Sequence, residues 1–365
     1  MSIHDIINAL NFFADPSLQE DYDNAGLITG NKNWACSGAL VCLDATEAVI
    51  QEAIDKKINL VIAHHPIVFK GLKKINGNNY VERALILAIK NDIALFAIHT
   101  NLDNVIHGVN GKIADILSLQ NRQILAPKKA LLQQLSVFVP IAHKEKLLNA
   151  LFAAGAGSIG NYSECSFSVV GEGSFKAMEG STPFVGNMGE RHLEVEEKID
   201  VIFPAWKQHN IVQAMKTNHP YEEVAYNIYN LDNVYAETGS GMVGNLPEKT
   251  DEAAFFKKIQ QLFQIPVIKH SPFRNKPIQK VALCGGAGSF LTRAAISAGA
   301  DVYLTGDLKY HEFFDADQQL VLADIGHYES EQYTIELLFD FLRGKFPNFA
   351  VLKTSVNTNP VCYFK

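Results

Sequence analysis

The sequence predicts an α/β protein whose core is built from two segments, with mostly parallel sheet flanked by helices and an inserted α+β domain between them. Short apolar runs alternate with helical stretches over residues 1–127, and the same alternation returns over residues 246–365. The intervening stretch, 128–245, has a different order of elements. Strands separated by helical segments are typical of a parallel sheet covered on both faces. With 365 residues, the chain is long enough for two cores.

The first core segment begins with a helix over 2–13. Ile3, Ile6, Ile7, Leu10 and Phe13 recur at helical spacing after Ser2, which suits a helix cap. The remaining elements follow from apolar runs and helical periodicity: strands at 38–43, 59–63 and 93–98, and helices at 47–57, 81–90 and 111–119.

The second core segment repeats this alternation. We expect strands at 278–284, 301–305 and 319–325, an edge strand at 350–356, and helices at 289–299 and 331–343.

The inserted segment reads strand, helix, strand, then strand, helix, strand, which is the order of a ferredoxin-like domain. The expected strands are 134–140, 164–170, 199–204 and 224–229, and the expected helices are 144–154 and 205–217. The stretch 171–190 is rich in Gly, Ser, Thr and Pro, which predicts a long hairpin or loop.

Composition excludes several classes of function. The net charge of −7 argues against a general nucleic-acid binder, which needs a basic face. No apolar run reaches the roughly 18 residues of a membrane span, and the first residues lack a basic leader. The five cysteines include no CxxC pair, which is typical of reduced thiols. We therefore expect a cytoplasmic protein with no membrane partner.

Two adjacent histidines, His64 and His65, stand where the apolar run 59–63 ends, and Pro66 stops the strand there. Ligands of open α/β sheets gather at such strand ends. Because neighbouring side chains on extended backbone point in opposite directions, the pair would serve two metal ions more easily than one. The alternative is that one histidine caps the strand and the other is solvated.

Two more strand ends carry potential ligands. His99 and Asp103 follow the run 93–98, with a helix-capping role as the alternative for Asp103. His327 and Glu331 follow the run 319–325 at i and i+4, so both lie on one helical face, whereas Glu329 falls off it. With one bridging carboxylate and water filling the remaining positions, the three ends suit a two-metal hydrolytic centre built from His64, His65, Asp103, His327 and Glu331.

Two glycine-containing turns are weaker candidates. Cys284-Gly-Gly-Ala-Gly-Ser289 follows a strand, so its amides would either cradle an anion or allow tight turn packing. In the stretch Thr305–Glu312, Lys309 or His311 would either contact a substrate phosphate or be solvated. We interpret His4 and His107 as structural.

The motifs Ala63-His-His-Pro66, His99-Thr-Asn-Leu-Asp103 and Gly326-His-Tyr-Glu-Ser-Glu331 occur in this order after Asp21-Tyr-Asp-Asn-Ala-Gly-Leu27. In this combination the chain resembles the dinuclear metal-centre protein family, whose members are often named GTP cyclohydrolase 1 type 2 homologs. The inserted segment, with His219-Pro-Tyr-Glu222, resembles the ferredoxin-like domain of the longer bacterial members, akin to nitrogen-regulatory and copper-tolerance trimers. Tyr22 stands where that family usually has Trp.

The resemblance implies two divalent ions per chain, of Zn, Fe, Mn or Ni, bound by His64, His65, Asp103, His327 and Glu331, with Glu331 as the bridge. It also implies a toroidal homohexamer. Two classes of function follow. One is a metal-dependent hydrolase, of cyclohydrolase or phosphoesterase type, acting on a nucleotide or pterin-like small molecule. The other is a metal-storing or regulatory scaffold whose inserted domain senses a small ligand.

His99 is assigned differently from the five ligands. Because Asp103 already comes from the same loop, we expect His99 to position a ligand, contact substrate or act as the general acid that protonates a leaving group.

Overall fold

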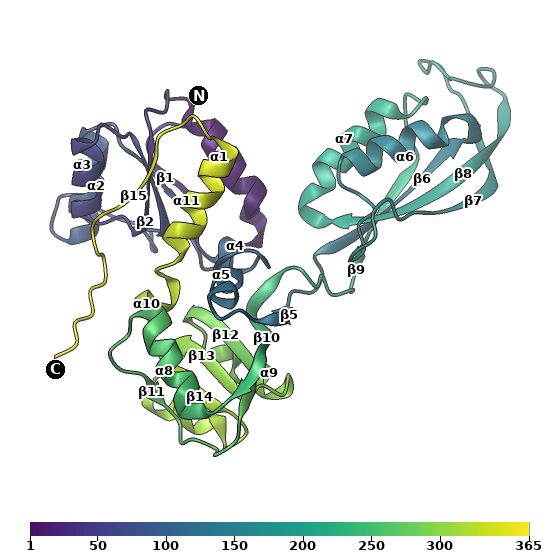
Figure 1. Cartoon of the computed structure of the whole chain (residues 1–365). Coiled ribbons are helices and arrows are strands. Elements are labelled where there is room, and N and C mark those ends of the chain that lie inside the picture. Colours follow the sequence, from purple (N-terminus) through teal and green to yellow (C-terminus); the bar gives the residue numbers. More distant parts are fainter. Residues whose placement is uncertain (365) are drawn as a thin grey trace. The chain divides into compact units, whose positions relative to one another are not determined.

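The computed structural model describes residues 1–364 and divides the chain into two compact units (Figure 1). The core unit consists of Met1–Pro127 together with the chain from Glu237 onward, and the inserted unit consists of Lys128–Ala236.

The core unit resumes nine residues earlier than the expected return at 246, which falls inside strand β10 (Gly239–Thr250). β10 begins Gly-Ser-Gly and contains two further non-apolar positions before Leu246, so its sequence lacks the alternation that marks a strand. The segment is a strand because it pairs with two neighbouring strands, which the local sequence does not indicate.

The first sheet of the core unit has the order β1-β4-β3-β2-β15. Four strands are parallel and β1 is antiparallel to β4. The strands are β1 (Gly26–Thr29), β2 (Ala39–Asp44), β3 (Leu60–His65), β4 (Ala94–Ala97) and β15 (Val351–Lys353). Helices cover both faces, as the fully buried β2, β3 and β4 require. On one face lie α1 (Ile3–Phe13) and α11 (Thr334–Lys345), and on the other lie α2 (Glu47–Asp55) and α3 (Tyr80–Lys90) (Figure 1).

The second sheet has the order β11-β14-β13-β12-β10-β5, and its central strands β12, β13 and β14 are parallel. The strands other than β10 are β5 (Gln120–Pro127), β11 (Lys269–His270), β12 (Ile278–Ala287), β13 (Val302–Gly306) and β14 (Val321–Asp324). The remaining helices of the unit are α4 (Thr100–Asp103), α5 (Val109–Ile116), α8 (Glu252–Phe263), α9 (Thr292–Ser297) and α10 (His327–Glu331). One continuous apolar cluster contains residues of both sheets, including Ile62, Phe96, Leu283 and Val321, so the two sheets share a core.

The inserted unit is an antiparallel sheet of order β7-β8-β6-β9 with two helices packed on one face. Its elements in chain order are β6 (Leu132–Pro140), α6 (Lys144–Ala153), β7 (Phe167–Lys176), β8 (Arg191–Pro204), α7 (Gln208–Asn218) and β9 (Tyr226–Leu231). This succession and strand order are those of a ferredoxin-like fold. The long hairpin expected at 171–190 includes six paired residues of β7, so the two strands extend further than their composition indicates.

Within residues 1–364, no helix combines the length and the apolar character that crossing a membrane requires.

We propose that the inserted unit is a separable domain, because the chain leaves and re-enters the core unit at paired positions. Pro127 at the end of β5 lies opposite Gly239 at the start of β10 in an antiparallel ladder. Joining Pro127 to Thr238 through Asn-Gly leaves three residues between the paired Pro127 and Gly239, which is a length that closes a β-hairpin. We expect the shortened protein to unfold in one cooperative transition and to bind the same number of divalent ions as the full chain. Non-cooperative unfolding, or loss of the ions, would show that the inserted unit completes the core.

Candidate metal centre

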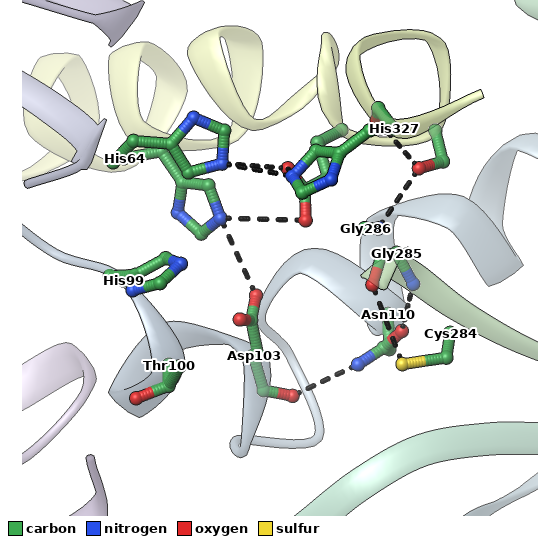
Figure 2. Close-up of polar contacts among 12 residues, drawn as sticks. His64, His99, Thr100, Asp103, Asn110, Cys284, Gly285, Gly286 and His327 are labelled. Carbon is green, nitrogen blue, oxygen red and sulfur yellow. Dashed lines mark hydrogen bonds and ion pairs between the residues drawn. The ribbon is translucent and has the colours of Figure 1, made fainter. Parts of the chain in front are cut away.

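The carboxyl ends of β3, β4 and β14 converge on one cluster of imidazoles and carboxylates. His64 and His65 end β3, Asp103 lies on the one-turn helix α4 that follows β4, and His327 and Glu331 lie on α10 after β14. The structure brings these five predicted residues together. His99, at the start of α4, lies beside them (Figure 2).

One part of the cluster surrounds His64, which is completely buried. Its Nε2 lies 3.6 Å from Asp103 Oδ1 and 3.8 Å from Glu331 Oε1. Among the residues that the structure describes, His64 Nε2 and Asp103 Oδ1 are buried polar atoms without a hydrogen-bond partner. A buried donor or acceptor without a partner is costly, and a cation between these atoms would satisfy both.

The second part of the cluster joins His65, His327 and Glu331. Glu331 Oε2 lies 3.0 Å from His65 Nε2 and 3.1 Å from His327 Nε2, and the two nitrogens are 3.3 Å apart. Glu331 thus directs one oxygen at each part of the cluster. Within each part, the potential ligand atoms lie within 4.8 Å of one another, and His64, His65 and His99 form a third group that meets the same distance.

Each imidazole is oriented by a hydrogen bond from its Nδ1, which leaves Nε2 facing the cluster. His65 Nδ1 lies 2.8 Å from Asp44 Oδ1, and His64 Nδ1 lies 2.8 Å from the carbonyl oxygen of Ile98. His327 Nδ1 lies 2.7 Å from Asp307, and His99 Nδ1 lies 2.8 Å from Asp23. Such outer partners fix the tautomer and orientation of histidines that bind metals.

Sequence reasoning did not assign these outer partners. Asp44 ends β2 and Asp307 directly follows β13, so the strand-end pattern that selected the five ligands also marks both. Asp23 has no such signal, because it lies in a loop that meets His99 only in the folded chain.

Burial and charge act in opposite directions in the cluster. Burial disfavours the protonated imidazoles, but hydrogen bonds to Asp44 and Glu331 raise the pKa of His65 to about 9. Hydrogen bonds to Asp307 and Glu331 likewise raise the pKa of His327 to about 11. Burial and the nearby Glu331 charge raise the pKa of Asp103 to about 7. The positive charge of the protonated imidazoles balances the negative charge of the carboxylates. Bound divalent cations would supply the same positive charge.

The glycines at the end of β12 make room for Glu331. Gly286 has φ +63°, and a Cβ at this position would lie 2.4 Å from Glu331 Oε1. The amides of Gly285, Gly286 and Gly288 already donate to Asn110 Oδ1, Ser330 Oγ and Thr305 Oγ1. These hydrogen bonds therefore favour tight turn packing over anion binding as the role of this turn. The turn faces the cluster.

The other candidate residues lie outside the cluster. Glu329 is buried with Oε1 accepting a hydrogen bond from the Asn359 side chain. Neither Lys309 nor His311 is among the described residues that line the cavity beside the cluster. His4 lies near Asn8 on α1, within hydrogen-bond distance of that side chain.

A cavity of about 670 Å³ opens on the cluster. Its wall combines ligand candidates with aromatic and small polar side chains. The lining includes Asp44, His65, His99, Asp103, His327 and Glu331, the rings of Tyr22, Phe69 and Phe290, and the polar residues Thr100, Asn104, Asn110 and Ser240. Sequence reasoning did not assign Phe69 and Phe290, because they lie in no recognisable pattern, whereas Tyr22 belongs to the first of the four motifs.

The fold and the site define the class of this protein. It is a mixed α/β protein with a potential metal-binding site, which consists of imidazoles and carboxylates at strand ends beside a cavity. The family model for Duf34/NIF3 (NGG1p interacting factor 3) matches residues 1–360. The chain belongs to this family.

Relatives share nearly the whole chain. A Halalkalibacterium halodurans protein named GTP cyclohydrolase 1 type 2 homolog is 38% identical over 363 residues, which is 98% of each chain. A Bacillus subtilis protein of the same name is 39% identical over 325 residues, 88% of this chain and 87% of that one. Among solved structures, a Bacillus cereus protein related to NIF3 has a TM-score of 0.88 at 36% identity. The match covers 100% of this chain and 99% of that one.

Proposed function

We propose that this protein is a metal-dependent hydrolase with two divalent ions per chain, acting on a nucleotide or a pterin-like small molecule. The observation that carries the proposal is that two of the three donor groups in the cluster share Glu331. His64 Nε2, Asp103 Oδ1 and Glu331 Oε1 form one set, and His65 Nε2, His327 Nε2 and Glu331 Oε2 form the other.

The donor chemistry fits first-row divalent ions. Imidazole nitrogens and carboxylate oxygens are the ligands that Zn, Mn and Fe(II) accept. With three protein donors per ion, each ion would keep an open coordination position. Catalytic metal sites have such a position, whereas structural sites are closed. When bound, two such ions supply Lewis acidity that activates water and polarises the bond under attack.

His99 is positioned to move a proton beside this centre. Its ring lies with its centroid 5.2 Å from that of His64 and 5.4 Å from that of His65. Asp23 Oδ1 accepts the Nδ1 hydrogen bond and Asp23 Oδ2 accepts one from the Thr100 amide, so the ring is held from behind. Nε2 is then the atom that can give a proton to a leaving group in the cavity, which His99 lines.

The test compares His99→Ala with His107→Ala in metal-loaded protein, because His107 is an exposed histidine outside the cavity wall. We expect both variants to keep two ions by elemental analysis. Turnover of a panel of nucleotides and pterins should fall about 100-fold or more in His99→Ala alone, since general acid–base catalysis contributes roughly 10²–10⁴-fold.

Two outcomes would contradict the assignment. A His99→Ala protein that keeps full turnover would exclude His99 as the proton donor, and one that holds a single ion would make His99 a ligand. Metal-loaded protein that binds its ions but turns over no compound of the panel would instead support the metal-storing or regulatory scaffold.

A further inference from the structure

Three solvent-exposed aromatic rings surround the cavity at the metal centre. Tyr22, Phe69 and Phe290 are 73%, 52% and 68% exposed, yet all three line the same 670 Å³ space. They come from segments far apart in the sequence, so no local turn requires their grouping. Phe69 also stands edge-on to His99, with ring centroids 5.7 Å apart. Exposed aromatic side chains gathered at a concave site are typical of ligand recognition.

The charges at this cavity do not favour a polyanion. Glu20, Asp44, Asp103 and Glu331 line it, and Asp23 and Asp307 stand directly behind His99 and His327. Two divalent ions would supply four positive charges against these six carboxylates. Among residues 1–364, no lysine or arginine lines the cavity. A phosphate chain adds several negative charges, which a site of this composition would repel or leave in solvent.

The small polar groups of the wall are engaged within the protein. Asn104 Nδ2 donates to the Leu18 carbonyl, and its Oδ1 accepts from Ser240. Asn110 Nδ2 donates to the Asp103 carbonyl, and its Oδ1 accepts from the Gly285 amide. Stacking, which tolerates different ring systems, is therefore the main interaction that the wall offers to a ligand.

We infer that the cavity recognises a planar heteroaromatic ring through Tyr22, Phe69 and Phe290, and that a phosphate chain on that ring adds little to the affinity. This inference rests on the proposed function only in placing the ring beside the hydrolytic centre. It assigns a nucleoside, nucleobase or pterin as the recognised part of the substrate.

Isothermal titration of the metal-loaded full chain tests the inference with guanosine, adenosine, pterin, GTP and tripolyphosphate as probes. We expect at least one of the ring compounds to bind. GTP should bind within about threefold of guanosine, and tripolyphosphate should not displace a bound ring compound. If GTP or tripolyphosphate binds about tenfold more tightly than every uncharged ring compound, or no ring compound binds at millimolar concentration, the inference is wrong.

Ring variants locate the binding within the cavity. Tyr22→Ser and Phe69→Ser should each weaken guanosine binding about tenfold without changing the metal content, and Tyr22→Phe should restore it. Phe12→Ser is the matched control, because Phe12 is an 87% exposed ring on α1 outside the cavity wall. Unchanged affinity in both Tyr22→Ser and Phe69→Ser would contradict the inference, even if the oligomeric state changed.

The readout is separate from that of the proposed hydrolase. A protein that binds guanosine through Tyr22 but hydrolyses nothing would support ring recognition and refute the hydrolase. A protein that hydrolyses nucleotides with an affinity that rises steeply with the number of phosphates would refute ring recognition alone.

Discussion

Glu331→Ala should lose at least one of the two divalent ions and hold any remaining ion at least about 100-fold more weakly. The physical reason is that each Glu331 oxygen belongs to a different donor set, so that one substitution removes a ligand from both. Elemental analysis after dialysis gives the number of ions, and competition with a chelator gives the affinity.

Glu329→Ala is the control for Glu331→Ala. Glu329 is buried on the same short helix but faces Asn359 instead of the cluster. We expect this variant to keep both ions. If Glu331→Ala also held two ions with unchanged affinity, Glu331 would not be the bridge.

Gly286→Ala should disrupt the same centre without removing any ligand. Its Cβ would lie 2.4 Å from Glu331 Oε1, and its φ of +63° is unfavourable for an L side chain. We expect metal affinity to fall about 10- to 100-fold as Glu331 is displaced. Stability should fall by about 1–2 kcal/mol from the backbone alone.

Gly299→Ala separates the two causes. Gly299 has φ +71°, but a Cβ there meets nothing within 4 Å. Both variants should lower the free energy of unfolding measured with denaturant, whereas only Gly286→Ala should lose metal. Equal metal binding by the two variants would show that Glu331 moves aside without cost.

The parallel strands of the fold could be predicted because their signal is local. Runs such as 60–63 and 281–284 are apolar at every position, and strands buried on both faces need this composition. β1 and β10 could not be predicted in this way. β1 is a partly exposed edge strand of four residues, and β10 begins Gly-Ser-Gly and is held as a strand by its pairing with β5 and β12.

Three of the five donors, His64, His65 and Asp103, follow from one rule, that the carboxyl ends of parallel strands meet at one edge of a sheet, because β3 and β4 are neighbours in the first sheet. The rule does not place them beside His327 and Glu331, because β14 belongs to the second sheet; His65 Nε2 lies 3.3 Å from His327 Nε2 because the two sheets pack on a shared core. The rule also does not say which side chain will orient each ring. The bond from Asp23 to His99 depends on the path of a loop, and the positions of Phe69 and Phe290 depend on the packing around the cavity. Metal identity and the toroidal hexamer stay predictions.

The antiparallel pairing of Pro127 with Gly239 also affects how such a protein can change during evolution. Because a hairpin with facing ends accepts either a short turn or a whole domain, a gene segment encoding 128–236 can be gained, lost or exchanged in a single recombination event. Neither β5 nor β10 has to shift its register, and the residues around Glu331 are unaffected. New sensing or assembly properties can thus be acquired at this hairpin while the chemistry at the strand ends is inherited unchanged.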